Sequence, residues 1–328
     1  SSAAIFGDVV VIGARDEDSN GVDAGAAYVF ARSGTVWTQE AKLVASDGAA
    51  GDSFGTSAAL AGDLLLIGAS RHDGKGQDSG AAYVFDRNLD NNFCVETETH
   101  DPWCERAVLT ANDGATGDLF GHAVAIHDST ALIGAPGGGS GAYPGSAYVF
   151  GKVAGVWTQQ DKLTADDGFV DDGYAFSVGL TGQTALITAD NDDDNGLETG
   201  STYIFTRSTT GWKQQYKLYA SDGGDWFGAG VAYGGDTAVI GALDIFDPMG
   251  IGSAYIFEFD FDEDGTRDDL DNCPYDANVD QSDVNANGVG DVCDIGATQT
   301  FSDGGTPAIE DCLNYSSCLG NGWVFLRG

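Results

Sequence analysis

Two acidic loops with the same spacing of oxygen-bearing side chains lie between residues 260 and 294. Each has a glycine at its sixth position, Gly265 or Gly288, where a short loop must turn sharply. Calcium takes about six to eight oxygen ligands, and this spacing folds a short backbone around one ion. The side-chain ligands at positions 1, 3, 5, 9 and 12 would be Asp260, Asp262, Asp264, Asp268 and Asp271, and then Asp283, Asn285, Asn287, Asp291 and Asp294. At position 7, Thr266 and Val289 would each supply a carbonyl oxygen.

The alternative interpretation of this segment is a solvated acidic linker. Its many carboxylates face a single arginine, Arg267, so without metal their repulsion should keep the segment from folding compactly. We favour calcium because two phased loops with glycine at position 6 rarely arise by chance.

The whole pattern, DxDxDGxxDxxDNCPxxxNxxQxDxNxNGxGDxCD, resembles a thrombospondin type 3 repeat, including Asn278 and Gln281. This resemblance implies calcium binding through the acidic positions and a disulfide between Cys273 and Cys293. The chain departs from that family at Asn285 and Asn287, which replace aspartates. Fewer ligand charges predict weaker affinity at the second loop.

Composition excludes several classes of partner. The net charge is −37 over 328 residues, which argues against nucleic acid and against anionic membrane surfaces. There is no apolar run near the ~20 residues that a membrane span needs. Two further cysteine pairs are close in sequence, Cys94 with Cys104 and Cys312 with Cys318, which is typical of disulfides formed in an oxidising compartment. We therefore expect an extracellular protein whose targeting segment was removed before Ser1.

A repeat covers most of the chain before residue 258. An apolar pair of segments, such as SAALAGDLLLIGAS (57–70), is followed by a glycine-rich loop and by a segment such as GAAYVF (80–85). The pattern recurs five times, each time as short apolar segments with tight-turn signals between them. With 49 glycines and no helical periodicity, the chain is predicted to be an all-β propeller or sandwich array, with about four strands in each of five repeats.

The repeats resemble FG-GAP repeats, which integrin α-subunits and secreted bacterial proteins contain. The motif stands as DSFG (52–55) with IGAS, DLFG (118–121) with IGAP and DWFG (225–228) with IGAL. One repeat departs from it, with Tyr174-Ala175 for Phe-Gly and ITAD (187–190) for IGAP. The resemblance implies a β-propeller of about five four-stranded blades. Fold alone does not assign a function to such a propeller.

The domain organisation follows from these two patterns. Residues 1–258 are predicted to form the propeller, and residues 259–295 the calcium-binding insertion. Residues 296–305, GATQTFSDGG, resemble YKLYASDGG and are predicted to be the last propeller strand. Residues 306–328 would form a disulfide loop and an edge strand.

Weaker calcium candidates lie on two acidic propeller loops, residues 15–25 and 190–200. The proposed ligands are Asp16, Asp18, Asn20 and Asp23 in the first loop, and Asn191, Asp193, Asn195 and Glu198 in the second. Calcium on loops of this kind is what the integrin-like resemblance implies. The alternative is a turn in which Asp and Asn bond their own backbone.

Other recurring residues favour structural roles. Aspartate pairs precede each FG motif, and recurrence in four repeats predicts that they brace turns between blades. Trp37, Trp157 and Trp212 recur at one repeat position and are predicted to pack between blades, whereas Trp103 and Trp226 are better candidates for the surface.

The catalytic inventory is poor, with four histidines and no metalloprotease, serine-hydrolase or phosphate-loop motif. We therefore predict a calcium-stabilised extracellular propeller for adhesion, matrix or surface assembly, with a protein or glycan ligand. The alternative is a secreted polysaccharide lyase or hydrolase with its acid and base on loops of one propeller face.

The two ends raise a question of assembly. Ser1 aligns with Thr56, after the point where a first Phe-Gly would stand, and residues 320–327, GNGWVFLR, resemble GAAYVFAR (25–32). Either the last strand closes the propeller within one chain, or it pairs with a neighbouring copy by strand addition and builds a fibre.

Overall fold

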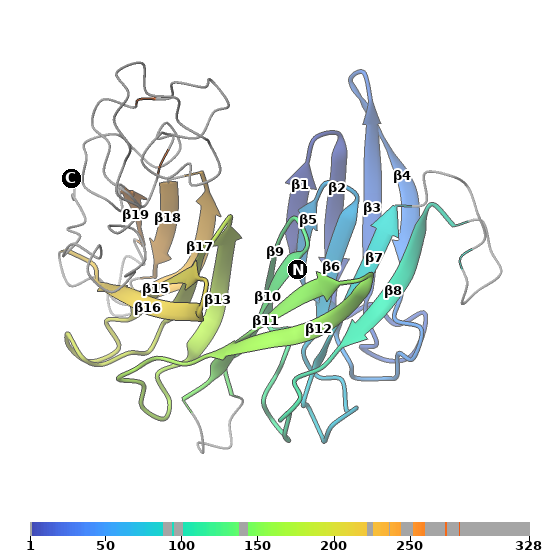
Figure 1. The fold of residues 1–328 in the computed structure, drawn as a ribbon. Coiled ribbons are helices and arrows are strands. Elements are labelled where there is room, and N and C mark those ends of the chain that lie inside the picture. Colours follow the sequence, from blue (N-terminus) through green and yellow to red (C-terminus); the bar gives the residue numbers. More distant parts are fainter. Residues whose placement is uncertain are drawn as a thin grey trace. The chain divides into compact units, whose positions relative to one another are not determined.

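The computed structural model describes residues 2–87, 94, 101–137, 144–221, 226–235, 237–243, 252–259, 273 and 282. Within these residues the regular secondary structure consists of β-strands, without α-helices. The strands form five consecutive antiparallel sheets (Figure 1). This architecture confirms the predicted all-β propeller with five repeats, and each sheet is one blade.

The blades follow the order of the chain. Blade one contains β1 (Ala3–Phe6), β2 (Val9–Ala14), β3 (Ala26–Ser33) and β4 (Val36–Leu43). Blade two contains β5 (Phe54–Ala61), β6 (Leu64–Ala69), β7 (Ala81–Arg87) and β8 (Trp103–Leu109). Blade three contains β9 (Ala123–His127), β10 (Thr130–Ala135), β11 (Ser146–Val153) and β12 (Val156–Leu163). Blade four contains β13 (Tyr174–Thr181), β14 (Thr184–Ala189), β15 (Ser201–Ser208) and β16 (Gly211–Leu218). Blade five contains β17 (Phe227–Gly234), β18 (Thr237–Ala242) and β19 (Ser253–Glu258) in its described part.

Each blade is a meander in which consecutive strands pair. A two-residue turn joins the first two strands of blade one, and Gly7 takes a positive φ of 56° there, as tight hairpin turns require. In each of the first four blades the pairing of the third and fourth strands shifts register at a bulge. In blade one the shift lies between Val29 and Phe30. Such a bulge increases the twist of the sheet.

The hydrophobic core lies between neighbouring blades. The Phe of each FG motif is fully buried, and its ring packs against the ring of the tyrosine in the third strand of the same blade. Phe54 lies 5.3 Å from the Tyr83 ring, and Tyr174, which replaces this Phe in blade four, lies 5.3 Å from Tyr203. Three such core clusters join blades one and two, two and three, and three and four. Both faces of the middle blades are therefore buried, which explains their near-continuous apolar strands.

Glycines of the repeat motif allow neighbouring blades to approach closely. A Cβ at Gly68, in the IGA segment of β6, would collide with the carbonyl oxygen of Gly121 in the next FG motif. Gly121 has a φ of 88°, a conformation that side chains disfavour. Both glycines are thus required by the packing of blade two against blade three.

By its internal contacts the chain divides into two units, residues 1–232 with 240–255, and residues 233–239 with 256–328. In the second unit Phe259 is buried and lies edge-on to Tyr233, with ring centroids 5.6 Å apart. Residues 296–305 and 306–328 lie outside the described residues, so the division of this region remains a prediction. In the part of the chain that the structure describes, no helix has the length and apolar character needed to cross a bilayer.

One sequence interpretation was wrong. Trp103 is buried, with 2% of its surface exposed, and is not a surface residue. It pairs with Arg87 as Trp37 pairs with Arg32, so it occupies the same position in its blade. Trp226 is partly exposed, and its Nε1 donates a hydrogen bond to Glu198.

Candidate metal sites and the charged junctions between blades

A tyrosine–aspartate hydrogen bond joins each pair of blades in the first four repeats. The aspartate follows the fourth strand of one blade, and the tyrosine lies in the third strand of the next blade. The hydroxyl groups of Tyr83, Tyr148 and Tyr203 lie 2.7, 3.0 and 3.0 Å from carboxylate oxygens of Asp47, Asp113 and Asp167. Burial, together with the neighbouring carboxylate, raises the pKa of Tyr148 to about 12, so the hydroxyl keeps its proton and donates.

The second aspartate of each pair braces the turn itself. Asp52, Asp118 and Asp172 accept the backbone N–H of the residue three positions earlier, at 2.8, 2.7 and 2.6 Å. Burial raises the pKa of each of these carboxyls, and the backbone hydrogen bond opposes that shift. The predicted structural role of the aspartate pairs is therefore confirmed for three repeats. The fourth pair, Asp222 and Asp225, lies outside the described residues.

The side chain that pairs with the junction aspartate comes from different elements at different junctions. At the second junction Lys162, in β12, lies 2.6 Å from Asp113 and above the Tyr148 ring. At the first junction the lysine position is Val108, and His72 from the β6–β7 loop lies 3.5 Å from Asp47 instead. A change at one position is thus matched by a change at the other.

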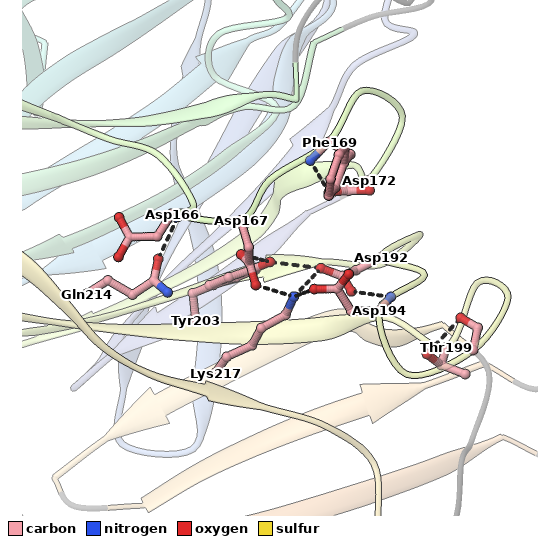
Figure 2. Close-up of polar contacts among 11 residues, drawn as sticks. Asp166, Asp167, Phe169, Asp172, Asp192, Asp194, Thr199, Tyr203, Gln214 and Lys217 are labelled. Carbon is pink, nitrogen blue, oxygen red and sulfur yellow. Dashed lines mark hydrogen bonds and ion pairs between the residues drawn. The ribbon is translucent and has the colours of Figure 1, made fainter. Parts of the chain in front are cut away.

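The third junction is the most charged (Figure 2). Lys217 Nζ lies 2.9, 2.8 and 2.6 Å from carboxylate oxygens of Asp167, Asp192 and Asp194, and the Tyr203 hydroxyl is 2.8 Å from Asp192. Only 9% of the Lys217 side chain and 3% of the Asp192 side chain are exposed. Burial alone would lower the pKa of Lys217, but hydrogen bonds to these carboxylates raise it overall. Lys217 is therefore a permanent cation that holds three carboxylates together.

The loop of this junction contains one of the weaker calcium candidates. The residues proposed as ligands were Asn191, Asp193, Asn195 and Glu198. The structure turns the alternate carboxylates, Asp192 and Asp194, toward Lys217, and leaves Asp193 and Asn195 exposed. Sequence reasoning missed this, although the lysine in WKQQYKL was a signal that could have identified the counter-charge.

The proposed ligand loops share one backbone arrangement. Asp18 and Asp193 each accept the backbone N–H of the residue five positions later, Asp23 or Glu198. In the less acidic loop of blade two, Asp73 does the same for Asp78, so this arrangement does not depend on a full set of carboxylates. Across the described residues, no group of three or more His, Cys, Asp or Glu side chains is arranged so that it could hold a metal ion. Calcium at these loops remains a prediction.

Asp190 differs from every other residue at its repeat position. It is buried, with 3% of its surface exposed, and within the described residues its Oδ1 has no hydrogen-bond partner. A Cβ at Gly173 would collide with this oxygen, so glycine makes room for it. Burial raises the pKa of Asp190 to about 6. Backbone hydrogen bonds lower this pKa, but their effect is smaller than that of burial.

Replacing Asp190 with asparagine should stabilise the protein at neutral pH. A carboxyl whose pKa is raised on folding contributes fully below about pH 4, and its contribution is lost as pH rises through about 6. The expected gain at pH 7 is on the order of 1–3 kcal/mol. Thermal melting from pH 4 to 8 measures it, with Asp193→Asn as the matched control in the same loop. A gain that is equal at pH 4 and pH 7 would contradict this explanation.

Most of the stronger predictions lie outside the described residues. These are all twelve ligands of the two loops between 260 and 294, together with Cys293, Cys312 and Cys318. Cys94 and Cys104 form the predicted disulfide, with their Cα atoms 5.3 Å apart. Cys273 is buried and disulfide-bonded, and its pairing with Cys293 stays a prediction.

Comparison with known protein families gives two matches. The thrombospondin type 3 repeat model matches residues 250–281, which includes the first acidic loop and ends before the second. No curated protein matches the chain. The FG-GAP repeat model matches residues 1–30, 37–85, 103–150, 157–205 and 212–257, one match for each blade. These matches cover more than half of the chain, which therefore belongs to the FG-GAP repeat family.

Proposed function

We propose that the protein is an extracellular, calcium-stabilised propeller that binds a protein or glycan ligand at a cell surface or in a matrix, in adhesion or surface assembly. The observation that carries this proposal is the direct succession of the two repeat types. The fifth FG-GAP match ends at residue 257, within the thrombospondin type 3 match that begins at residue 250.

The donor chemistry of that segment fits calcium. Its loop positions offer carboxylate, amide and backbone carbonyl oxygens, which are the hard ligands that calcium takes in proteins. Asp260, Asp262 and Asp264 begin the loop that lies within the family match. Bound calcium would neutralise the repulsion among these carboxylates and allow the segment to fold compactly.

The blade junctions support a binding role, because they make a rigid platform for exposed loops. Loops 15–25, 70–80 and 190–200 all connect the second strand of a blade to its third. Asp16, Asp73 and Asp193 are exposed on these loops. Equivalent loops of successive blades lie at the same edge, so their carboxylates form an acidic rim that suits a basic or a calcium-bridged ligand.

Binding of the full chain should require calcium. The test is a solid-phase assay against a panel of matrix proteins and polysaccharides, in millimolar calcium and after chelation. We expect saturable binding to at least one member of the panel, loss of binding with chelator, and recovery with calcium but not with magnesium. Magnesium is the matched control because it demands a smaller octahedral site.

Two results would overturn the proposal. One is binding that persists unchanged in chelator. The other is the appearance of new reducing or unsaturated ends in a polysaccharide, abolished by replacing one carboxylate, which would favour the enzyme alternative.

A further inference from the structure

A pocket lies between the outer strands of blades three and four, where β12 of one blade approaches β16 of the next. Its volume of about 370 Å³ falls within the ~300–1,000 Å³ that is typical of small-molecule sites. The apolar side chains of its lining include Leu163 and Phe205, which are buried. Four further lining residues are partly or largely exposed, namely Asp166, Trp212, Lys213 and Gln214. Both blades therefore build this pocket.

Two hydrogen bonds across the blade boundary fix the walls of the pocket. The Oδ2 atom of Asp161 accepts the backbone N–H of Trp212 at 3.3 Å. In the other direction, Gln214 Oε1 accepts the backbone N–H of Asp166 at 3.1 Å (Figure 2). A ligand that enters walls already held in place loses less free energy to ordering, so this arrangement favours binding.

The Trp212 side chain is more open than the tryptophan at the same position of blade two. Trp103 is 2% exposed, and its Nε1 donates a hydrogen bond to Glu40 Oε2 of the preceding blade at 3.1 Å. Gln160 stands at the position of Glu40, since each is the extra residue of its bulge. Its Nε2 instead donates to the carbonyl oxygen of Thr158 in its own strand, at 3.2 Å. Trp212 is left partly exposed in the pocket.

The charges around the pocket balance. Lys162 and Lys213 face Asp161 and Asp166 among its lining residues. The whole chain has 14 lysines and arginines against 51 aspartates and glutamates, so cations are strongly enriched here. The field of the whole protein repels an anionic ligand, and a cationic ligand would find no net negative charge in this pocket. A neutral ligand is therefore favoured.

The donors and acceptors at the pocket are mixed and surround an aromatic ring. Lys213 can only donate hydrogen bonds and ionised Asp166 can only accept them, whereas the amide of Gln214 can do both. A sugar ring has an apolar C–H face, and hydroxyl groups at its edge that both donate and accept. The flat apolar body of tryptophan fits such a face.

We propose that the pocket between blades three and four binds a neutral sugar unit of a glycan. The C–H face of the sugar lies on Trp212, and its hydroxyl groups bond to Asp166 and Lys213. This inference rests on the proposed function, because it names the class of the ligand and the place where it binds.

Oligosaccharide binding by the full chain in millimolar calcium tests this site. The probes are neutral glucan, mannan, galactan and chitin oligosaccharides, with alginate and heparin oligosaccharides as anionic comparisons. We expect saturable binding of at least one neutral probe, measured by isothermal titration, and weaker or no binding of the anionic ones. Asp166→Ala should weaken the binding of that probe by about tenfold, because it removes a charged hydrogen-bond acceptor.

Matched variants separate this pocket from the rest of the repeat array. Asn112→Ala changes the equivalent exposed turn residue of the preceding junction and should leave the affinity unchanged. Trp212→Phe should weaken binding by reducing the apolar platform. Trp157→Phe is its control, because Trp157 is 8% exposed and its ring is covered. Melting temperatures of all four variants show whether any loss of binding comes from unfolding.

Three results would overturn the inference. These are no saturable binding of any neutral probe, wild-type affinity in Asp166→Ala, and equal losses in Asp166→Ala and Asn112→Ala. A chain that binds a matrix protein only with calcium, but binds no oligosaccharide, would contradict this inference and leave the proposed function standing. Oligosaccharide binding that Asp166→Ala weakens and chelator does not change would contradict the calcium requirement of the proposed function and support this pocket.

Discussion

Replacing Lys217 with methionine should lower the free energy of unfolding by about 3–5 kcal/mol, the usual cost of removing one partner from a buried ion pair. Lys217 is the cation that Asp167, Asp192 and Asp194 share, and its own side chain is 9% exposed. Without it, Asp192 remains buried with its charge uncompensated. Methionine keeps the length and apolar stem of the side chain, so the loss reports the charge. Urea unfolding with calcium present measures it, through the midpoint at constant slope.

Lys42→Met is the matched control for this experiment. Lys42 occupies the same strand position, but its side chain is 32% exposed and it pairs with the partly exposed Glu17. A solvated pair of this kind contributes little to stability, so Lys42→Met should cost far less than Lys217→Met. Equal losses in the two variants would show that burial of the third junction does not matter to its energy. That result would contradict the description of the Lys217 cluster as a brace between blades three and four.

Removing calcium should be the second large perturbation. A site of extracellular affinity, about 10⁻⁴–10⁻³ M, adds about 2.7 kcal/mol when calcium is present at ~100 times its Kd. Chelation should therefore lower the melting temperature and expose residues 260–294 to protease before the blades. Limited proteolysis with mass spectrometry locates the first cuts. First cuts within blades one to four, or cleavage rates that ignore the chelator, would contradict the prediction.

Much of the fold could be predicted because the residues that pack neighbouring blades together recur at the same position of each repeat. Phe54 and Phe120 recur because each fills the gap between two blades, and Gly68 recurs because a carbonyl oxygen of the next blade approaches it. The aspartate pairs recur for the same reason, since Asp47 and Asp113 each meet a tyrosine one blade later. The residues that recur in every repeat thus indicate the contacts between neighbouring blades.

The candidate sites were harder to predict, because side-chain direction in an irregular loop depends on distant residues. Spacing suggested Asp193 as a calcium ligand, but the carboxylates that turn toward Lys217 are Asp192 and Asp194. Trp103 was misplaced because it follows an insertion that obscures the repeat spacing. Its pairing with Arg87 restores the register that the sequence hid.

The junctions between blades differ at a few positions, and these positions change in pairs. A consensus pattern of the repeat does not show such pairs. His72 replaces an acidic residue where Val108 replaces the lysine, so the partner of Asp47 comes from a loop of the blade and not from its fourth strand. Gly173 and Asp190 change together in blade four, because the glycine leaves room for a buried carboxyl. Such paired departures can be recognised only when the two positions are known to be neighbours.

We expect calcium to bind the two acidic loops between residues 260 and 294. Isothermal titration of the calcium-stripped full chain with calcium tests it most directly, using wild type, Asp264→Ala and Asn287→Asp, with Asp193→Asn as a propeller-loop control. We expect saturable binding near 10⁻⁴–10⁻³ M. We also expect weaker binding in Asp264→Ala, tighter binding in Asn287→Asp, and wild-type binding by these loops in Asp193→Asn. Absence of saturable binding in millimolar calcium, or isotherms that neither Asp264→Ala nor Asn287→Asp changes, would contradict it.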